Sequence, residues 1–222
     1  MLCASVSERT AEACGEILDG LREGEMTELR ADLMSVRGGG EVDDAAMAEL
    51  CARKVPKVLT CRDLKVPGFT DERKDLLTSL MDGGGVQMVD LEIEAPQEYR
   101  EAIIASAKSN GVKVVVSYHN YEETPADAQL QEIIETCKTY GADIAKVAVA
   151  CKSRQDAARV LALYNTEFPT VALGMGAPGK ITRMAALQLG APFTFVALSP
   201  ETATAPGQLT LDQMRQIADI TA

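Results

Sequence analysis

One lysine in the middle of an apolar stretch has the clearest chemical potential in this sequence. Lys146 lies in the stretch 143–150, whose other residues after Asp143 are isoleucine, alanine and valine, as in a buried strand. Such a lysine either extends along the surface with its amine in water, or it is buried and kept for its amine. Burial disfavours the ammonium form, so a buried lysine can supply the free amine that forms a Schiff base with a carbonyl substrate.

The only histidine of the chain ends the strand-like segment that precedes this stretch. His119 closes the segment 113–119, and neighbouring strands of a sheet lie about 4.8 Å apart. If both side chains point to the same face, His119 and Lys146 reach the same site. A lone histidine is commonly structural, but beside a Schiff-base lysine an imidazole can move protons near neutral pH. We therefore interpret Lys146 and His119 as candidate catalytic residues.

Polar side chains recur at every second position near the ends of several strand-like segments, and residues two apart in a strand share a face. The groups that share a face in this way are Glu28, Arg30 and Asp32; Thr60 and Arg62; Asp90, Glu92 and Glu94; and Ser117 and His119. In a barrel the outer face is covered by helices, so a polar face points inward, and active sites lie at the carboxyl ends of the strands. Structural ion pairs are the alternative, but an unpaired buried charge costs roughly several kcal/mol. We favour a ligand site.

Short apolar segments and longer amphipathic segments alternate eight times along the chain. The expected strands are residues 2–6, 26–32, 57–62, 87–93, 113–119, 143–149, 170–175 and 193–198. The expected helices include residues 43–53, 70–81, 96–109, 125–140, 153–168, 181–189 and 211–220. Asp43 and Ser153 are expected N-caps. Eight such units in 222 residues favour a (β/α)8 TIM barrel over an open doubly wound sheet, and we expect one domain over residues 1–222.

The charge balance restricts the class of partner. The chain has 22 basic and 33 acidic residues, a net charge of -11, which disfavours binding to nucleic acid and to anionic membranes. Its six cysteines include no C-x-x-C pair, so we expect reduced thiols and no metal site. We find no signal peptide and no apolar segment long enough to span a membrane. These features predict a soluble, cytoplasmic protein, and we expect no nucleic acid, no membrane and no cofactor as its partner.

A glycine-rich stretch follows the seventh expected strand. Residues 174–179 match G-x-G-x-x-G, and with Lys180 they nearly match a P-loop. A dinucleotide site is disfavoured because no acidic residue ends a strand about 20 residues later, and a P-loop lacks its magnesium ligand because Ile181 replaces serine or threonine. Phosphate binding after strands seven and eight of a barrel remains open. It would make the protein a Schiff-base aldolase that acts on a phosphorylated sugar.

Six segments, spread in order over nearly the whole chain, carry a family resemblance. They are Glu28-Leu29-Arg30-Ala31-Asp32, Thr60-Cys61-Arg62, residues 117–125 around His119, Ala145-Lys146-Val147-Ala148-Val149, residues 174–183 ending in Arg183, and Thr204-Ala205-Pro206-Gly207-Gln208. They resemble the corresponding segments of type I 3-dehydroquinate dehydratase, the Schiff-base enzyme of the shikimate pathway. The resemblance implies a carbon–oxygen lyase of the stand-alone form that makes 3-dehydroshikimate in aromatic amino acid biosynthesis. A homodimer is the family expectation.

The resemblance also implies roles for residues. Lys146 forms the imine with the substrate ketone, and His119 removes a proton from the adjacent carbon and protonates the departing hydroxyl. Arg183 holds the substrate carboxylate, because a guanidinium suits a planar anion. The other substrate-binding residues implied are Glu28, Arg30, Arg62, Met175, Thr204 and Gln208, the last two from a lid loop after the eighth strand.

The sequence departs from the family pattern at three positions. Val66 stands where many bacterial members have a glutamate that orients the histidine, and Glu92 is our candidate for a replacement carboxylate. Thr204 replaces a serine but keeps a hydroxyl, and Leu173 replaces a methionine. Two other functions stay open beside the dehydratase, namely the aldolase and a barrel without catalysis that serves as a binding module.

Overall fold

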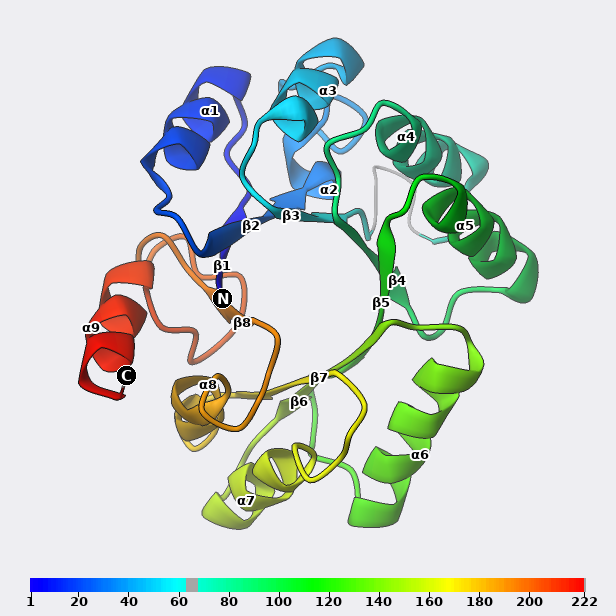
Figure 1. Cartoon of the computed structure of the whole chain (residues 1–222). Helices are drawn as coiled ribbons and strands as arrows, with labels where there is room; N and C mark the ends of the chain where they lie inside the picture. The colour runs from blue at the N-terminus through cyan, green and yellow to red at the C-terminus, as the bar shows by residue number, and fades with distance from the viewer. Residues whose placement is uncertain (63–67, 222) are drawn as a thin grey trace. The chain divides into compact units, whose positions relative to one another are not determined.

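The computed structural model describes residues 1–62 and 68–221 (Figure 1). Val66, the departure from the family pattern noted above, lies outside the described residues. Contacts divide the chain into two compact units. We call Ser5–Val115 the N-terminal unit, and Met1–Ala4 together with Val116–Ala222 the C-terminal unit.

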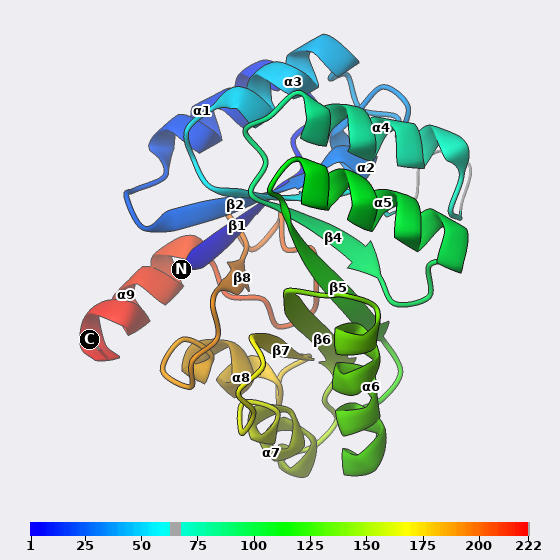
Figure 2. The ribbon, with the colours of Figure 1, turned by 45° about the vertical axis from the view of Figure 1, so that its right-hand side comes forward.

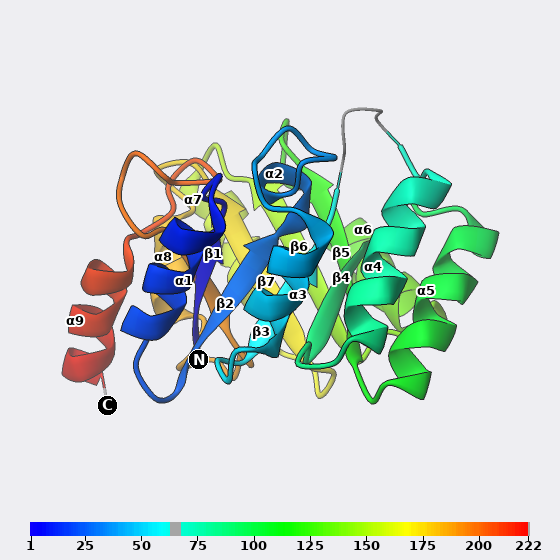
Figure 3. The same ribbon diagram turned by 90° about the horizontal axis from the view of Figure 1, so that it is seen from above.

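The N-terminal unit contains parallel strands and the helices that connect them. Its strands are β2 (Glu25–Arg30), β3 (Lys57–Thr60) and β4 (Met88–Glu92), and its helices are α1 (Ala11–Gly20), α2 (Ala31–Met34), α3 (Asp44–Ala52), α4 (Asp71–Asp82) and α5 (Gln97–Ser109). Strand β3 pairs with β2 and with β4. Helices α3, α4 and α5 pack in a row (Figure 3). The register places Thr60 between Arg30 and Asp90, so the polar ends of three strands meet.

The C-terminal unit has the same alternation. Its strands are the start of β1 (Leu2–Val6), most of β5 (Lys113–Asn120), β6 (Ile144–Ala150), β7 (Thr170–Met175) and β8 (Thr194–Val196); its helices are α6 (Asp127–Thr139), α7 (Arg154–Ala162), α8 (Lys180–Ala185) and α9 (Leu211–Thr221). Strand β6 pairs with β7 along its length, and β8 pairs with β1. Helices α7 and α8 pack against each other and against β7 (Figure 2).

Capping side chains fix where several helices begin. Asp43 accepts a hydrogen bond from the Ala46 amide at 2.8 Å, and Ser153 accepts one from the Asp156 amide at 3.2 Å. Both satisfy amides that have no partner within the helix. The two predicted N-caps are confirmed.

All eight strands are parallel members of one sheet, in the order β7-β6-β5-β4-β3-β2-β1-β8. This order, with helices between the strands, confirms the predicted (β/α)8 fold class. The expected strand 26–32 ends at Arg30, however, and Asp32 lies in α2, so the prediction that Asp32 continues the strand face is wrong.

Two expected helices are also shorter in the structure. The expected helix 153–168 ends at Ala162, where the amides of residues 163–165 donate to carbonyl oxygens three residues earlier instead of four. The expected helix 181–189 ends at Ala185. Among the described residues, no helix is long and apolar enough to cross a membrane.

Candidate active site

Lys146 is buried in the middle of β6. Its side chain belongs to a residue that is only 4% exposed, and its Nζ lies 4.2 Å from the centroid of the Phe195 ring on β8. Strand β6 places the residue opposite Val171 of β7. Of the two interpretations of this lysine, the structure therefore supports a buried amine and not a side chain that extends into water.

His119 lies one residue before the end of β5, the strand next to β6 in the sheet. Its ring stacks loosely on Tyr121, with ring centroids 6.2 Å apart and an interplanar angle of 19°. Tyr121 is 67% exposed, whereas His119 is partly buried. The imidazole thus lies at the carboxyl end of its strand, where barrel active sites are found.

Arg183 carries a buried positive charge on α8. The residue is 2% exposed, and no carboxylate among the described residues forms a salt bridge with it. Burial lowers the pKa of Arg183 to about 10, while the Cys151 thiol and the Tyr164 phenol act in the opposite direction. Its Nε has no hydrogen-bond partner within the described part of the chain. A buried guanidinium in this state favours an anionic ligand.

The glycine-rich stretch uses its amides within the protein. The Gly174 amide donates to Thr182 Oγ1 at 2.7 Å, and the Gly176 amide donates to Pro206 O at 2.9 Å. The Gly179 and Lys180 amides donate to carbonyl oxygens of the same loop. A Cβ on Gly179 would lie 2.5 Å from the backbone of Gly174, so close packing explains the glycines.

The segment Thr204–Gln208 closes on itself. Gln208 Oε1 accepts hydrogen bonds from the Thr204 amide at 2.8 Å and from Thr204 Oγ1 at 3.2 Å. Gly207 has φ +77°, and a Cβ there would lie 2.6 Å from Gly176 O, so this turn requires glycine. Together with Lys180 and Pro200, the segment lines a cavity of about 480 Å³.

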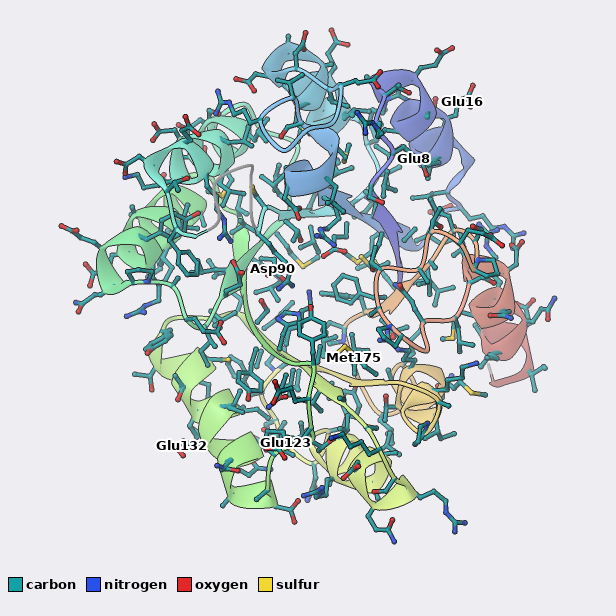
Figure 4. The ribbon with its side chains drawn as sticks, turned by 180° about the vertical axis from the view of Figure 1, so that it is seen from behind. Glu8, Glu16, Asp90, Glu123, Glu132 and Met175 are labelled. Atoms are coloured by element: carbon teal, nitrogen blue, oxygen red, sulfur yellow. The ribbon has the colours of Figure 1, made fainter. Side chains whose placement is uncertain are left out.

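Met175 is the last residue of β7 and lies beside the end of β6 in the sheet. The Met175 carbonyl accepts a hydrogen bond from the Cys151 amide at 2.9 Å, and the register pairs Met175 with Ala150. The methionine is 4% exposed, and its side chain is labelled in Figure 4. It therefore lies on the same pair of strands as Lys146.

Glu28 is held by two hydroxyl groups in the N-terminal unit. Its Oε2 accepts a hydrogen bond from Ser5 Oγ at 2.8 Å, and its Oε1 accepts one from Thr60 Oγ1 at 2.9 Å. The residue is 4% exposed. Each carboxylate oxygen thus accepts a hydrogen bond from a different hydroxyl group, and the two bonds together fix the orientation of the carboxylate.

The arginines of this unit are paired with carboxylates. Arg30 donates to both oxygens of Asp32, at 3.0 and 2.5 Å, and a nitrogen of Arg62 lies 3.8 Å from a carboxylate oxygen of Asp90. Burial opposes the charge on Arg62, but the carboxylates of Asp90 and Glu28 raise its pKa above the usual value. The two guanidinium groups therefore stay charged in a partly buried position.

Glu92 already has a cationic partner. Its carboxylate forms an ion pair with Arg73 of α4, which is 1% exposed. Burial raises the pKa of Glu92 above its ordinary value, and Arg73 opposes this rise. Our suggestion that Glu92 tunes His119 stays a prediction, but the structure gives this carboxylate a role within its own unit.

A family model described as "Type I 3-dehydroquinase" matches residues 2–222. The chain belongs to this family. The family predicted from the sequence is thereby confirmed, and every segment discussed above falls within the matched residues.

Relatives and a solved structure agree with this assignment. The 3-dehydroquinate dehydratase of Methanosarcina barkeri is 35% identical over 211 residues, covering 88% of this chain and 85% of the relative. That of Methanothermobacter thermautotrophicus is 34% identical over 97% of this chain and 95% of its own length. The crystal structure of 3-dehydroquinate dehydratase from Geobacillus kaustophilus has a TM-score of 0.84 at 25% identity, covering 99% of this chain and 90% of that one.

The structure also identifies contacts that the sequence analysis of this type I 3-dehydroquinase missed. Phe195 faces Lys146, Ser5 holds Glu28, and Arg73 binds Glu92. None of these contacts has a signal in the sequence, because each joins residues that lie far apart in the chain.

Proposed function

We propose that this protein dehydrates 3-dehydroquinate to 3-dehydroshikimate through a Schiff base on Lys146. The reaction follows from membership in the type I 3-dehydroquinase family. The observation that supports Lys146 as the nucleophile is its burial in β6, since a lysine without a catalytic role rarely replaces an aliphatic residue there.

The reaction can be written from the chemistry of an amine and an imidazole. The Lys146 amine adds to the substrate ketone, and loss of water gives an iminium that withdraws electrons from the adjacent carbon. His119 removes a proton from that carbon, and the resulting electron pair expels the neighbouring hydroxyl as His119 returns the proton to it. Water then hydrolyses the iminium and releases the amine, so the net change is the loss of one water molecule.

Arg183 binds the substrate carboxylate in this proposal. A buried guanidinium without a carboxylate partner among the described residues gains a charge-assisted hydrogen-bonded pair when a planar anion arrives. The arginines of the N-terminal unit have such partners already, so they are weaker candidates for the same role.

The remaining binding residues contact the ring of the substrate, and Glu28, Arg30 and Arg62 bind its hydroxyl groups. Glu28 has a fixed carboxylate that accepts hydrogen bonds, while Arg30 and Arg62 donate them. Thr204 and Gln208 come from the segment after β8, whose internal hydrogen bonds would be exchanged for bonds to ligand when it closes. Met175 supplies an apolar contact from β7.

We further propose that residues 1–222 act as one catalytic domain, that the protein is a homodimer, and that it works in the cytoplasm. The family match over residues 2–222 supports one domain. The net charge of -11 and the six buried thiols suit a reducing compartment.

The aldolase alternative is weakened by the glycine-rich stretch. Phosphate binding there would use backbone amides, but the amides of Gly174, Gly176 and Gly179 already donate to protein oxygens. Family membership weakens the alternative of a binding module without catalysis, and the chain contains both candidate catalytic residues, Lys146 and His119.

Borohydride reduction tests the proposal directly. We expect 3-dehydroquinate with borohydride to leave a stable adduct on the peptide that contains Lys146, detected by mass mapping. Lys146→Met should abolish the adduct, and the matched control Lys152→Met, at an exposed lysine, should leave it unchanged. Intact folded protein without an adduct would contradict the proposal, and an adduct formed only with phosphorylated sugars would favour the aldolase.

A further inference from the structure

We infer that Phe195 is a positioning residue for the Schiff-base lysine, and that the face of its ring stabilises the positive charge on Lys146 Nζ. The inference rests on the proposed function, because it assigns a partner to the cationic intermediate of that reaction. Phe195 would act on the lysine through the face of its ring, without a hydrogen bond and without a charge of its own.

The geometry is that of a cation–π contact. Lys146 Nζ lies 4.2 Å from the centroid of the Phe195 ring, well inside the limit of about 6 Å at which the ring quadrupole attracts a cation. Both residues are buried, at 4% and 5% exposure. Removal of water strengthens such a contact, because the ring no longer competes with solvent for the cation.

The ring is held in place by its own strand. Phe193 and Phe195 pack edge to face, with centroids 5.4 Å apart and an interplanar angle of 76°, and Phe193 is fully buried. Strand β8 pairs with β1 through Phe195 and Cys3. A side chain on a paired strand with a buried aromatic neighbour is a rigid support for the reacting nitrogen.

The contact has a different value for each form of the nitrogen. The neutral amine that attacks the ketone gains little from the ring, whereas the iminium is a cation and gains from it. An iminium bound to substrate cannot keep all the hydrogen bonds of an ammonium, because it has lost N–H groups. The ring face needs no N–H group, so it can act on the charge throughout the reaction.

Replacement of Phe195 by an aliphatic residue tests the contribution of the aromatic face separately from that of an apolar side chain. Phe195→Leu keeps an apolar side chain but removes the π face. At saturating 3-dehydroquinate we expect the initial rate of borohydride trapping, which reports the iminium, to fall by roughly 2- to 30-fold, the range that cation–π energies give. Phe195→Tyr keeps the face and should restore trapping to about the wild-type rate.

Site-specific incorporation of fluorinated phenylalanines at position 195 gives a second measurement that does not depend on the leucine variant folding. Each added fluorine weakens the quadrupole with little change in shape. We expect the trapping rate to fall stepwise from phenylalanine to the monofluoro and trifluoro forms, while the thermal unfolding midpoint stays constant. An equal rate across the series would overturn the inference.

The Lys146→Met background provides the control for a merely structural role. No iminium forms there, so Phe195→Leu should leave the noncovalent affinity for 3-dehydroquinate unchanged, within about 2-fold by the usual scatter of additive effects. A comparable loss in both backgrounds would mean that Phe195 only shapes the pocket. Wild-type protein that gives no adduct would refute the proposed function, whereas a wild-type adduct that is insensitive to position 195 would refute this inference alone.

Discussion

Arg73 on α4 forms an ion pair with Glu92 at the end of β4, and its guanidinium also lies over two aromatic rings. The Arg73 Cζ is 4.8 Å from the centroid of Phe69 and 5.7 Å from that of Tyr99. Arg73 is 1% exposed, so the pair ties a helix to the strand beneath it in a nearly dry environment.

Arg73→Met should destabilise the protein by about 3–5 kcal/mol at neutral pH, because it leaves the Glu92 carboxylate buried without its partner. Burial raises the pKa of Glu92 above its ordinary value of 4.5, and loss of Arg73 raises it further. The folded state then keeps a proton that the unfolded chain has released, so the free energy of unfolding falls as pH rises above 4.5. The destabilisation should therefore be larger near pH 8 than near pH 5, as measured by urea unfolding.

The double variant Arg73→Met with Glu92→Gln is the control for this prediction. It removes both charges, and such replacements are commonly close to neutral in stability. We expect it to recover most of the loss and to abolish the extra dependence on pH. A double variant that is as unstable as Arg73→Met, with no change in pH dependence, would show that packing of the arginine on Phe69 and Tyr99 is the dominant contribution.

Lys57 at the start of β3 is a second buried cation, but its partners are carbonyl groups. Its Nζ donates to the carbonyl oxygens of Arg53, Val55 and Gly85 at 2.7, 2.7 and 3.0 Å. Lys57→Met should destabilise the protein by about 2–4 kcal/mol, because three partly buried hydrogen bonds of a buried ammonium are lost. Lys113→Met, at the exposed first residue of β5, should change stability by less than about 0.5 kcal/mol. Equal effects in thermal unfolding would contradict this assignment.

Much of the fold could be predicted because strand periodicity is a local property, and the family could be predicted because its motifs are short segments of sequence. The alternation that placed Glu28, Thr60 and Asp90 on polar faces reappears in the register, where β3 lies between β2 and β4. Asp32 failed the same test because the backbone turns into α2 directly after Arg30, and no residue type in that segment forces the turn. A polar residue two positions after Arg30 is equally compatible with the first turn of a helix and with a continued strand.

Contacts between distant segments were beyond such reasoning. Phe195 faces Lys146 because β8 and β6 present these side chains to each other, which the order of residues does not encode. The glycines at 174 and 179 matched a phosphate-binding pattern, yet they are there because two backbone segments approach within the space of a Cβ. Both outcomes depend on the three-dimensional packing of the C-terminal unit.

His119→Ala should separate imine formation from elimination. The variant keeps Lys146, so borohydride should still trap an adduct with 3-dehydroquinate. Turnover should fall by about 10²- to 10⁴-fold, the usual contribution of a positioned acid–base group. Steady-state rates and trapping measured on the same preparation check this, and Tyr121→Leu serves as the matched control, because it removes the ring stacked on His119 but leaves the imidazole in place. An unaffected turnover rate in His119→Ala would remove this residue from the mechanism.

Arg183 should oppose stability while it supports binding. Arg183→Met removes a buried charge that has no carboxylate partner among the described residues, so we expect the free energy of unfolding to rise by about 1–2 kcal/mol. The same variant should lose about 2–4 kcal/mol of substrate binding, roughly 30- to 1,000-fold in kcat/KM. Arg183→Lys keeps the charge without the planar fork and should fall between the two. Chemical unfolding measures the expected gain in stability, and steady-state kinetics measure the expected loss of kcat/KM. A variant that loses stability together with activity would show that Arg183 supports the core and does not bind the substrate carboxylate.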